Sequence, residues 1–101
     1  MTRVLVRYSV KPDRVAENEQ LVHDVYAELA RTQPDGLRYA TFKLPDGVSF
    51  VHLAEHGPDN PLQHVAAFAR FQEGIRDRCD EQPVVAHLEE VGSYRFMEEA
   101  T

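Results

Sequence analysis

The chain has 101 residues, of which 43% are hydrophobic and 28% charged, a balance that suits one compact globular domain and excludes wholesale disorder. Its formal net charge of −6 argues against a surface that follows nucleic-acid phosphates. The single cysteine, Cys79, excludes an intrachain disulfide, no apolar run reaches the ~20 residues of a membrane span, and the first residues lack the apolar block of a signal peptide. We therefore expect one domain over residues 1–101, located in the cytoplasm, with no nucleic-acid or membrane partner.

The first third of the chain predicts a strand followed by a helix. Apolar and polar side chains alternate over residues 3–10, with Val4, Val6, Tyr8 and Val10 expected to face a core. After Pro12 the period changes to 3.6 residues, which predicts a helix from about residue 13 to residue 33. The turn residues at positions 34–36, Pro-Asp-Gly, end this helix.

The middle of the chain predicts an antiparallel hairpin. Residues 37–44 and 48–55 are rich in β-branched and aromatic side chains, and a second Pro-Asp-Gly turn at positions 45–47 separates them. Two such strands around a short turn pair with each other.

The last third predicts a helix and a final strand. Asp59 or Asn60 can cap the helix, Pro61 suits its first position, and apolar side chains recur at helical spacing as far as Cys79. Pro83 then breaks the pattern, and we expect a strand over residues 84–96 with a bulge or bend at Gly92.

The resulting order, β-α-β-β-α-β, predicts an α+β ferredoxin-like fold, in which a four-stranded antiparallel sheet carries two helices on one face. The strands, however, carry apolar side chains on both faces, as the neighbouring residues Leu5 and Val6 or Phe50 and Val51 indicate. A sheet face without helices should not leave such side chains in water, so we expect a second copy to cover it. The sequence thus predicts a homodimer joined through the sheets.

This plan resembles the dimeric α/β-barrel superfamily over essentially the whole chain. The resemblance is carried by the order of elements and by the stretch FVHLAEHGPDNPLQHVAAFARFQEGI, a strand that ends in an acidic residue, a capping turn and a helix rich in Ala, His and Phe. The chain looks most like the antibiotic-biosynthesis-monooxygenase domains. His64, near the start of the second helix, is similar to a histidine common there in the family. The resemblance implies a sheet-to-sheet dimer, often with a pocket between sheet and helices, and an oxygenase that uses no cofactor.

The chain also departs from parts of that superfamily. Haem-degrading members resemble one another in an Asn, a Trp and a His around the pocket, and this chain has no Trp. The phenol-oxidising members also tend to use Trp, Asn and Tyr near the substrate, and in this chain Tyr8, Tyr39 and Tyr94 could take the place of such residues. The sequence also lacks a Gly-rich phosphate loop and a G-x-S-x-G elbow, which argues against nucleotide chemistry and serine hydrolysis.

His52 is the most informative single residue, because it shares its strand face with an apolar row. A hydrogen-bonded core histidine is one interpretation, and a pocket acid or base is the other. In the second interpretation His52 is the base that deprotonates a phenol or enol, and Tyr8, Tyr39 and Arg7 hold the developing anion. A salt bridge is the alternative use of Arg7, and core packing is that of the tyrosines. No histidine or cysteine spacing indicates a metal site.

Two classes of function follow. The first is a cofactor-independent monooxygenase that acts on a small aromatic or polyketide-like molecule, with His52, Tyr8, Tyr39 and Arg7 as candidate catalytic residues. The second is a non-catalytic dimer that binds a small ligand or serves as a scaffold. Because the first class of function rests on a resemblance of fold, the geometry of the site is needed to distinguish the two classes.

Overall fold

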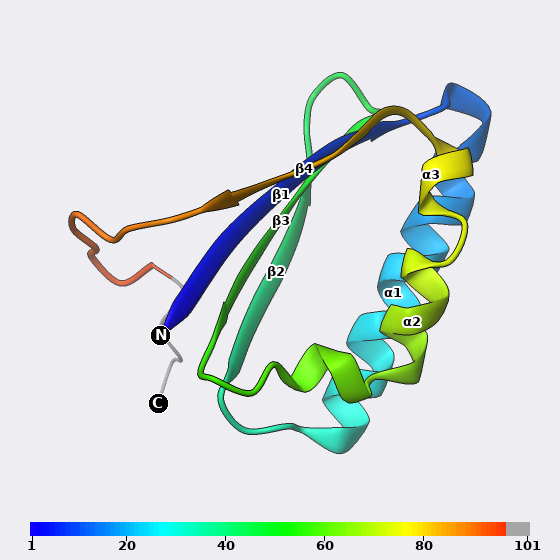
Figure 1. The fold of residues 1–101 in the computed structure, drawn as a ribbon. Coiled ribbons are helices and arrows are strands. Elements are labelled where there is room, and N and C mark those ends of the chain that lie inside the picture. The colour runs from blue at the N-terminus through cyan, green and yellow to red at the C-terminus, as the bar shows by residue number, and fades with distance from the viewer. Residues whose placement is uncertain (97–101) are drawn as a thin grey trace.

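The computed structural model describes residues 1–96, so the last five residues of the predicted domain lie outside the described part (Figure 1). Along the chain the elements are β1 (Thr2–Val10), η1 (Pro12–Arg14), α1 (Val15–Thr32), β2 (Leu37–Lys43), β3 (Ser49–His56), η2 (Pro61–His64), α2 (Ala66–Gln72), α3 (Ile75–Arg78) and β4 (Cys79–His87). The three α-helices and the strands follow the predicted β-α-β-β-α-β order once α2 and α3 are taken together.

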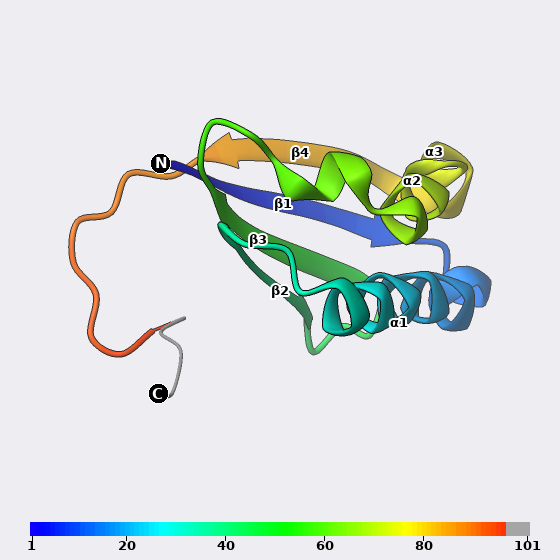
Figure 2. The same cartoon turned by 90° about the horizontal axis from the view of Figure 1, so that it is seen from below.

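The four strands form one antiparallel sheet in the order β2-β3-β1-β4. Helices α1 and α2 both lie on the same face of this sheet, α1 over the β2–β3 side and α2 nearer β4 (Figures 1 and 2). The opposite face carries no helix in the described residues. This arrangement confirms the predicted α+β ferredoxin-like fold.

The predicted hairpin is also confirmed, and its turn shows why. The Asp46 carboxylate accepts the backbone N–H groups of Val48 and Ser49 at 3.0 and 2.8 Å, and Gly47 takes the left-handed φ of +78° that the turn requires. The register that follows sets Thr41 opposite His52.

The prediction of one continuous second helix is wrong, because three short helices occupy its span. The Asn60 side chain accepts the Leu62 N–H at 3.0 Å and caps η2, as predicted, but Val65 has an extended backbone that separates η2 from α2. Gly74 then adopts a φ of +76° between α2 and α3. A glycine reaches this conformation without steric cost, so the chain changes direction there instead of continuing the helix.

The last strand begins earlier and ends sooner than predicted. Strand β4 starts at Cys79, five positions before the predicted strand, and ends at His87. Leu88 still donates its backbone N–H to the Arg3 carbonyl at 2.9 Å, and residues 89–96 then extend away from the sheet (Figure 1). Pro83 is tolerated because β4 is an edge strand and because the register shifts there, between the pairs of Arg7 and Ser9. Gly92 lies beyond the strand, so the irregularity expected there occurs at Pro83.

The core lies between the sheet and the helices, where the even-numbered side chains of β1 and β3 point. Tyr8, Val10 and Phe50 are buried there against Val22, Val25, Phe71 and other apolar side chains of the helices. On the other face Phe42 and Val84 remain 49% and 68% exposed. Within the described residues, no helix is both long and apolar enough to cross a membrane.

Candidate functional site

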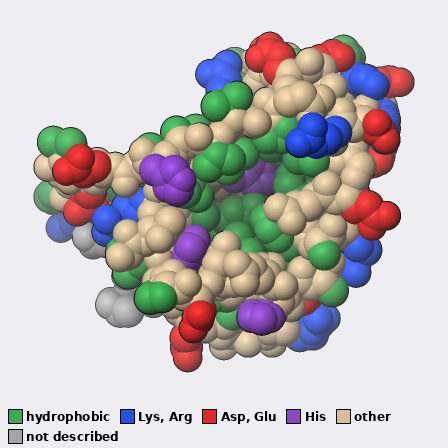
Figure 3. Space-filling model, in the orientation of Figure 1, with side chains coloured by type: hydrophobic (Ala, Val, Ile, Leu, Met, Phe, Trp, Pro, Cys, Tyr) green, Lys and Arg blue, Asp and Glu red, His purple; other side chains and the backbone are tan. Residues whose placement is uncertain are grey.

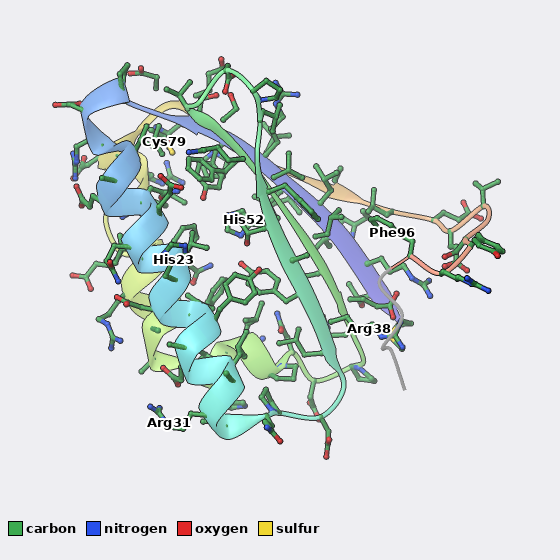
Figure 4. The ribbon with its side chains drawn as sticks, turned by 180° about the vertical axis from the view of Figure 1, so that it is seen from behind. His23, Arg31, Arg38, His52, Cys79 and Phe96 are labelled. Atoms are coloured by element: carbon green, nitrogen blue, oxygen red, sulfur yellow. The ribbon has the colours of Figure 1, made fainter. Side chains whose placement is uncertain are left out.

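His52 lies at the centre of the sheet, on the side that faces the helices (Figure 4). It is only 4% exposed, and both of its ring nitrogens are bonded to tyrosine hydroxyls. Nε2 lies 2.7 Å from Oη of Tyr8, and Nδ1 lies 2.6 Å from Oη of Tyr39 and 3.1 Å from Oγ1 of Thr41. The register explains the grouping, because His52 pairs with Val6 on β1 and with Thr41 on β2, and the two tyrosines lie two residues from those partners.

A second polar group extends this arrangement toward the helices. Asn18 of α1 is fully buried and donates its amide N–H to Oη of Tyr8 at 3.0 Å. The guanidinium of Arg78, which is 1% exposed, donates its Nε–H to Oδ1 of Asn18 at 3.1 Å. Arg78 also donates to the backbone carbonyls of Phe71 and Glu73, at 2.6 and 3.1 Å, where α2 ends. A continuous chain of hydrogen bonds thus runs from Arg78 through Asn18 and Tyr8 to His52.

The other end of this chain meets the surface between α1 and β2. Tyr26 of α1 stacks on Tyr39 with ring centroids 5.4 Å apart, and its hydroxyl lies 2.8 Å from Oγ1 of Thr41. Two open grooves, of about 450 and 560 Å³, flank this tyrosine pair, and both are lined by Tyr26 and Tyr39. Thr41 and His23 line the smaller groove. His52 lines neither groove, so a ligand in either one would contact Tyr26 and Tyr39 and not the imidazole.

The opposite side of the molecule is also hollowed. Figure 3 shows a depression between the sheet and the helices in which hydrophobic side chains gather, with histidine side chains among them. The exposed Val85 and the half-buried Val6 lie on the sheet face that points to the helices, as the register requires. Apolar side chains thus dominate the approach to the site from this side.

Burial decides the charge state of the site. Desolvation lowers the pKa of His52 to about 4, because burial removes the water that would otherwise stabilise the charged imidazolium. Burial also raises the pKa of Tyr8 and of Tyr39 well above the usual tyrosine range. The imidazole and both phenols are therefore neutral near pH 7, and their hydrogen bonds are those between neutral groups.

The structure brings together three of the four residues predicted from sequence. Tyr8, Tyr39 and His52 form the centre of the site, whereas Arg7 is exposed on the opposite face of the sheet, since neighbouring residues of a strand point to opposite faces. Arg7 therefore has no place among the groups around His52, and this part of the predicted site is corrected. Tyr94 lies in the segment beyond β4 and is 79% exposed.

Sequence reasoning missed four polar residues of the site: Asn18, Tyr26, Thr41 and Arg78. A signal existed for two of them. Asn18 occurs at helical spacing between Val15 and Val22, and Arg78 follows Phe71 and Ile75 in the same way. A polar side chain on an apolar helical stripe indicates a buried hydrogen-bonded group.

The acidic, histidine and cysteine side chains of the described residues lie too far apart to form a metal site. Within residues 1–96, no group of three or more His, Cys, Asp and Glu side chains could hold a metal ion. Cys79 is buried, and its burial raises the pKa of the thiol. Glu55 forms a salt bridge with Arg3 at 2.6 Å, away from His52.

Comparison with known proteins gives a clear result for the fold. No protein-family model matches the chain, and no curated protein matches it. A Nitrosomonas europaea protein provisionally named antibiotic biosynthesis monooxygenase is similar in structure, with a TM-score of 0.73, 15% identity, and coverage of 91% of this chain and 100% of that one. A provisionally named antibiotic biosynthesis monooxygenase from Caulobacter crescentus has a TM-score of 0.69, 23% identity and 90% coverage of both chains.

A third similar structure is a variant of SnoaB, a cofactor-independent oxygenase from Streptomyces nogalater. Its TM-score is 0.66 at 17% identity, and the match covers 93% of this chain and 96% of that one. At these identities the likeness concerns the fold, and the activity has to be argued from the site. This chain has the fold of the antibiotic-biosynthesis-monooxygenase-like proteins, as its sequence predicted.

Proposed function

We propose that the protein is a cofactor-independent monooxygenase that acts on a small aromatic or polyketide-like molecule. The observation that carries this proposal is the buried His52 between two tyrosine hydroxyls, one of which, Tyr39, lines grooves at the surface. The stacked rings of Tyr26 and Tyr39 suit a flat aromatic ligand. The fold shared with SnoaB supports the same class of reaction.

In this proposal His52 positions Tyr39 and does not contact the substrate. Both imidazole nitrogens are within hydrogen-bond distance of hydroxyl groups, and almost none of the ring is exposed. The oxygen of the substrate binds at the hydroxyl of Tyr39 instead. A hydrogen bond from a preorganised hydroxyl stabilises the substrate as its oxyanion, with the proton released to solvent through the groove.

The oxyanion is electron-rich at its ring carbons and reacts with molecular oxygen. A carbon–oxygen bond forms at a ring C–H position, and the resulting peroxide loses water as its O–O bond breaks. The phenol is thereby oxidised to a quinone. One oxygen atom of O₂ enters the product, and the other leaves as water with the two hydrogens that the phenol has lost.

Replacement of Tyr39 tests the proposal. Oxygen uptake with a panel of polycyclic phenols should fall about 100-fold in kcat/KM in Tyr39→Phe, because the variant keeps the ring but loses the donor to the oxyanion. Tyr94→Phe removes the same atom from an exposed residue outside the site and should leave uptake unchanged. Equal uptake by the wild type and Tyr39→Phe, or by the wild type and His52→Ala, contradicts the proposed role of the site.

One observation favours a second function, that of a non-catalytic small-ligand-binding or scaffold protein. Among the described residues, every buried side-chain nitrogen and oxygen has a hydrogen-bond partner, so the His52 network is complete without a ligand. If phenols raise the melting temperature without oxygen uptake, the protein is a binding module. If they do neither, it is a scaffold.

We further propose that the helix-free face of the sheet binds a second copy of the chain. The register places apolar side chains side by side there: Leu5 pairs with Leu53 and Ala86, Leu53 with Ala40, and Val51 with Phe42. Together with the exposed Phe42 and Val84, they form an apolar patch whose exposure to water is energetically unfavourable.

Sedimentation tests this assembly. The wild type should sediment as a dimer at micromolar concentration, and Phe42→Asp should sediment as a monomer, because it sets two buried carboxylates into a two-fold interface. Ala27→Asp places the same charge on the exposed side of α1 and should remain dimeric. A monomeric wild type rejects the proposed interface.

A further inference from the structure

We infer that Arg78 and Asn18 set the direction of the whole hydrogen-bond chain, hold His52 as the tautomer protonated on Nδ1, and so make Tyr39 a hydrogen-bond donor toward its ligand. This inference rests on the proposed function for its last step, the meeting of Tyr39 with a ligand. Its earlier steps, the direction of the hydrogen bonds and the tautomer of His52, concern the protein without a ligand.

The direction begins at Arg78, because a guanidinium donates hydrogen bonds and cannot accept them. The Asn18 atom that lies 3.1 Å from Nε of Arg78 must therefore be the amide oxygen. The amide nitrogen of Asn18 then points to Tyr8 and donates to its Oη at 3.0 Å. Arg78 is itself held by the carbonyls of Phe71 and Glu73 and by the ring of Phe71, which lies 5.3 Å from the guanidinium carbon.

The direction then passes from Tyr8 to His52. Oη of Tyr8 already accepts a hydrogen bond from Asn18, so its own hydrogen has to find an acceptor. Among the described contacts of Tyr8, Nε2 of His52, at 2.7 Å, is that acceptor. A neutral imidazole carries its single hydrogen on one nitrogen, so the hydrogen of His52 is on Nδ1.

Nδ1–H then donates to Tyr39, whose Oη lies at 2.6 Å, with Thr41 at a longer 3.1 Å. The oxygen of Tyr39 therefore acts as an acceptor on its inner side, and its hydroxyl hydrogen can be given to Thr41 or to a ligand that enters through the grooves that Tyr39 lines. A ligand at this position receives a hydrogen bond and is not required to give one.

The class of ligand follows from this direction. A carbonyl or an oxyanion can take the hydrogen of Tyr39, and no ionisable base on the protein has to approach it. The site selects molecules that present such an oxygen beside an aromatic ring, such as hydroxyquinones or acidic phenols bound as anions. Arg78 acts as a positioning residue, since it lies at the far end of the chain from the ligand.

Nitrogen-15 NMR of histidine-labelled protein near pH 7 tests the inference without any ligand. In the wild type Nδ1 of His52 should show the shift of a protonated imidazole nitrogen, and Nε2 that of an unprotonated one. Asn18→Asp should invert this pattern, because a carboxylate paired with Arg78 accepts the hydrogen of Tyr8 and leaves Nε2 to donate to Oη of Tyr8. Gln20→Glu makes the same amide-to-acid change on the exposed side of α1 and should leave the tautomer as in the wild type.

A wild-type His52 protonated on Nε2 overturns the inference, whether or not the variant folds, and so does an Asn18→Asp protein that keeps the hydrogen on Nδ1. The ligand step is read separately, with para-nitrophenol as the probe. Its bound form should be about tenfold more acidic than the free dye, by absorbance, and Tyr39→Phe should abolish this difference. A dye that binds without becoming more acidic overturns the donor role of Tyr39. A dye that does not bind counts against the proposed ligand groove, and the tautomer measurement remains decisive for the chain of hydrogen bonds.

Discussion

Acidification from pH 7 to pH 5 is expected to lower the free energy of unfolding by about 2 kcal/mol through His52 alone. Burial lowers the pKa of His52 from 6.5 to about 4 in the folded protein, whereas the unfolded chain restores the ordinary value. Between these two values the unfolded state binds a proton that the folded state does not, so stability rises with pH. The contribution is complete above the unfolded pKa and is lost as the pH falls from about 6.5 toward about 4.

Urea titrations at a series of pH values measure this effect, and His52→Gln is the matched variant. Glutamine keeps a hydrogen-bonding amide but does not titrate, so its unfolding free energy should change by much less over the same range. The carboxylates whose pKa values are lowered in the fold, Glu17, Glu28 and Asp46, lose their contribution only as the pH falls below their ordinary pKa values of 3.8 to 4.5, which lie under the range from pH 7 to pH 5. Parallel pH profiles for the two proteins would show that His52 remains protonated or solvated in the fold.

Removal of the buried guanidinium is expected to be the most destabilising single change at the site. Arg78→Met should lower the free energy of unfolding by about 3 kcal/mol or more, because three acceptors lose their donor in the interior. These are Oδ1 of Asn18 and the carbonyl oxygens of Phe71 and Glu73. Methionine fills most of the volume, so the loss reports hydrogen bonds more than packing.

Arg76→Met is the control, since Arg76 lies on the same short helix and is exposed. Its effect should stay within about 0.5 kcal/mol. Arg78→Lys separates charge from geometry, because an ammonium keeps the charge but lacks the planar fork that reaches three acceptors. It should recover only part of the loss. Equal stability of Arg78→Met and Arg76→Met would mean that the guanidinium does not support the end of α2.

The accuracy of the sequence prediction differed between local and distant features. The hairpin was predicted correctly because its signals are local, namely alternating strands around Pro-Asp-Gly and an aspartate that binds the next backbone N–H groups. The boundary between the last helix and β4 was wrong by five residues, because Cys79 fits both an apolar helical stripe and the start of a strand. Period alone does not separate the two.

The candidate site shows the same division. Strand parity predicted that Tyr8 faces the core, and it also shows that Arg7, one residue from Tyr8, belongs to the opposite face. It left open which face His52 and Tyr39 occupy, because their placement depends on the register between strands. The contacts of Asn18 could not be foreseen, because its partners lie far away along the chain. Tyr8 is ten residues before it and Arg78 sixty residues after it.

The sequence by itself thus determined the order of the elements, the pairing of β2 with β3 and the apolar character of both sheet faces, since these follow from turn chemistry and from periods of two and 3.6 residues. Only the tertiary structure decided that His52 is neutral and that its two nitrogens bind Tyr8 and Tyr39. It also decided that the buried Arg78 is linked to Tyr8 by hydrogen bonds through Asn18. The physical reason is that desolvation and hydrogen-bond direction depend on what surrounds a group in space. In this fold those surroundings come from α1, the end of α3 and three different strands.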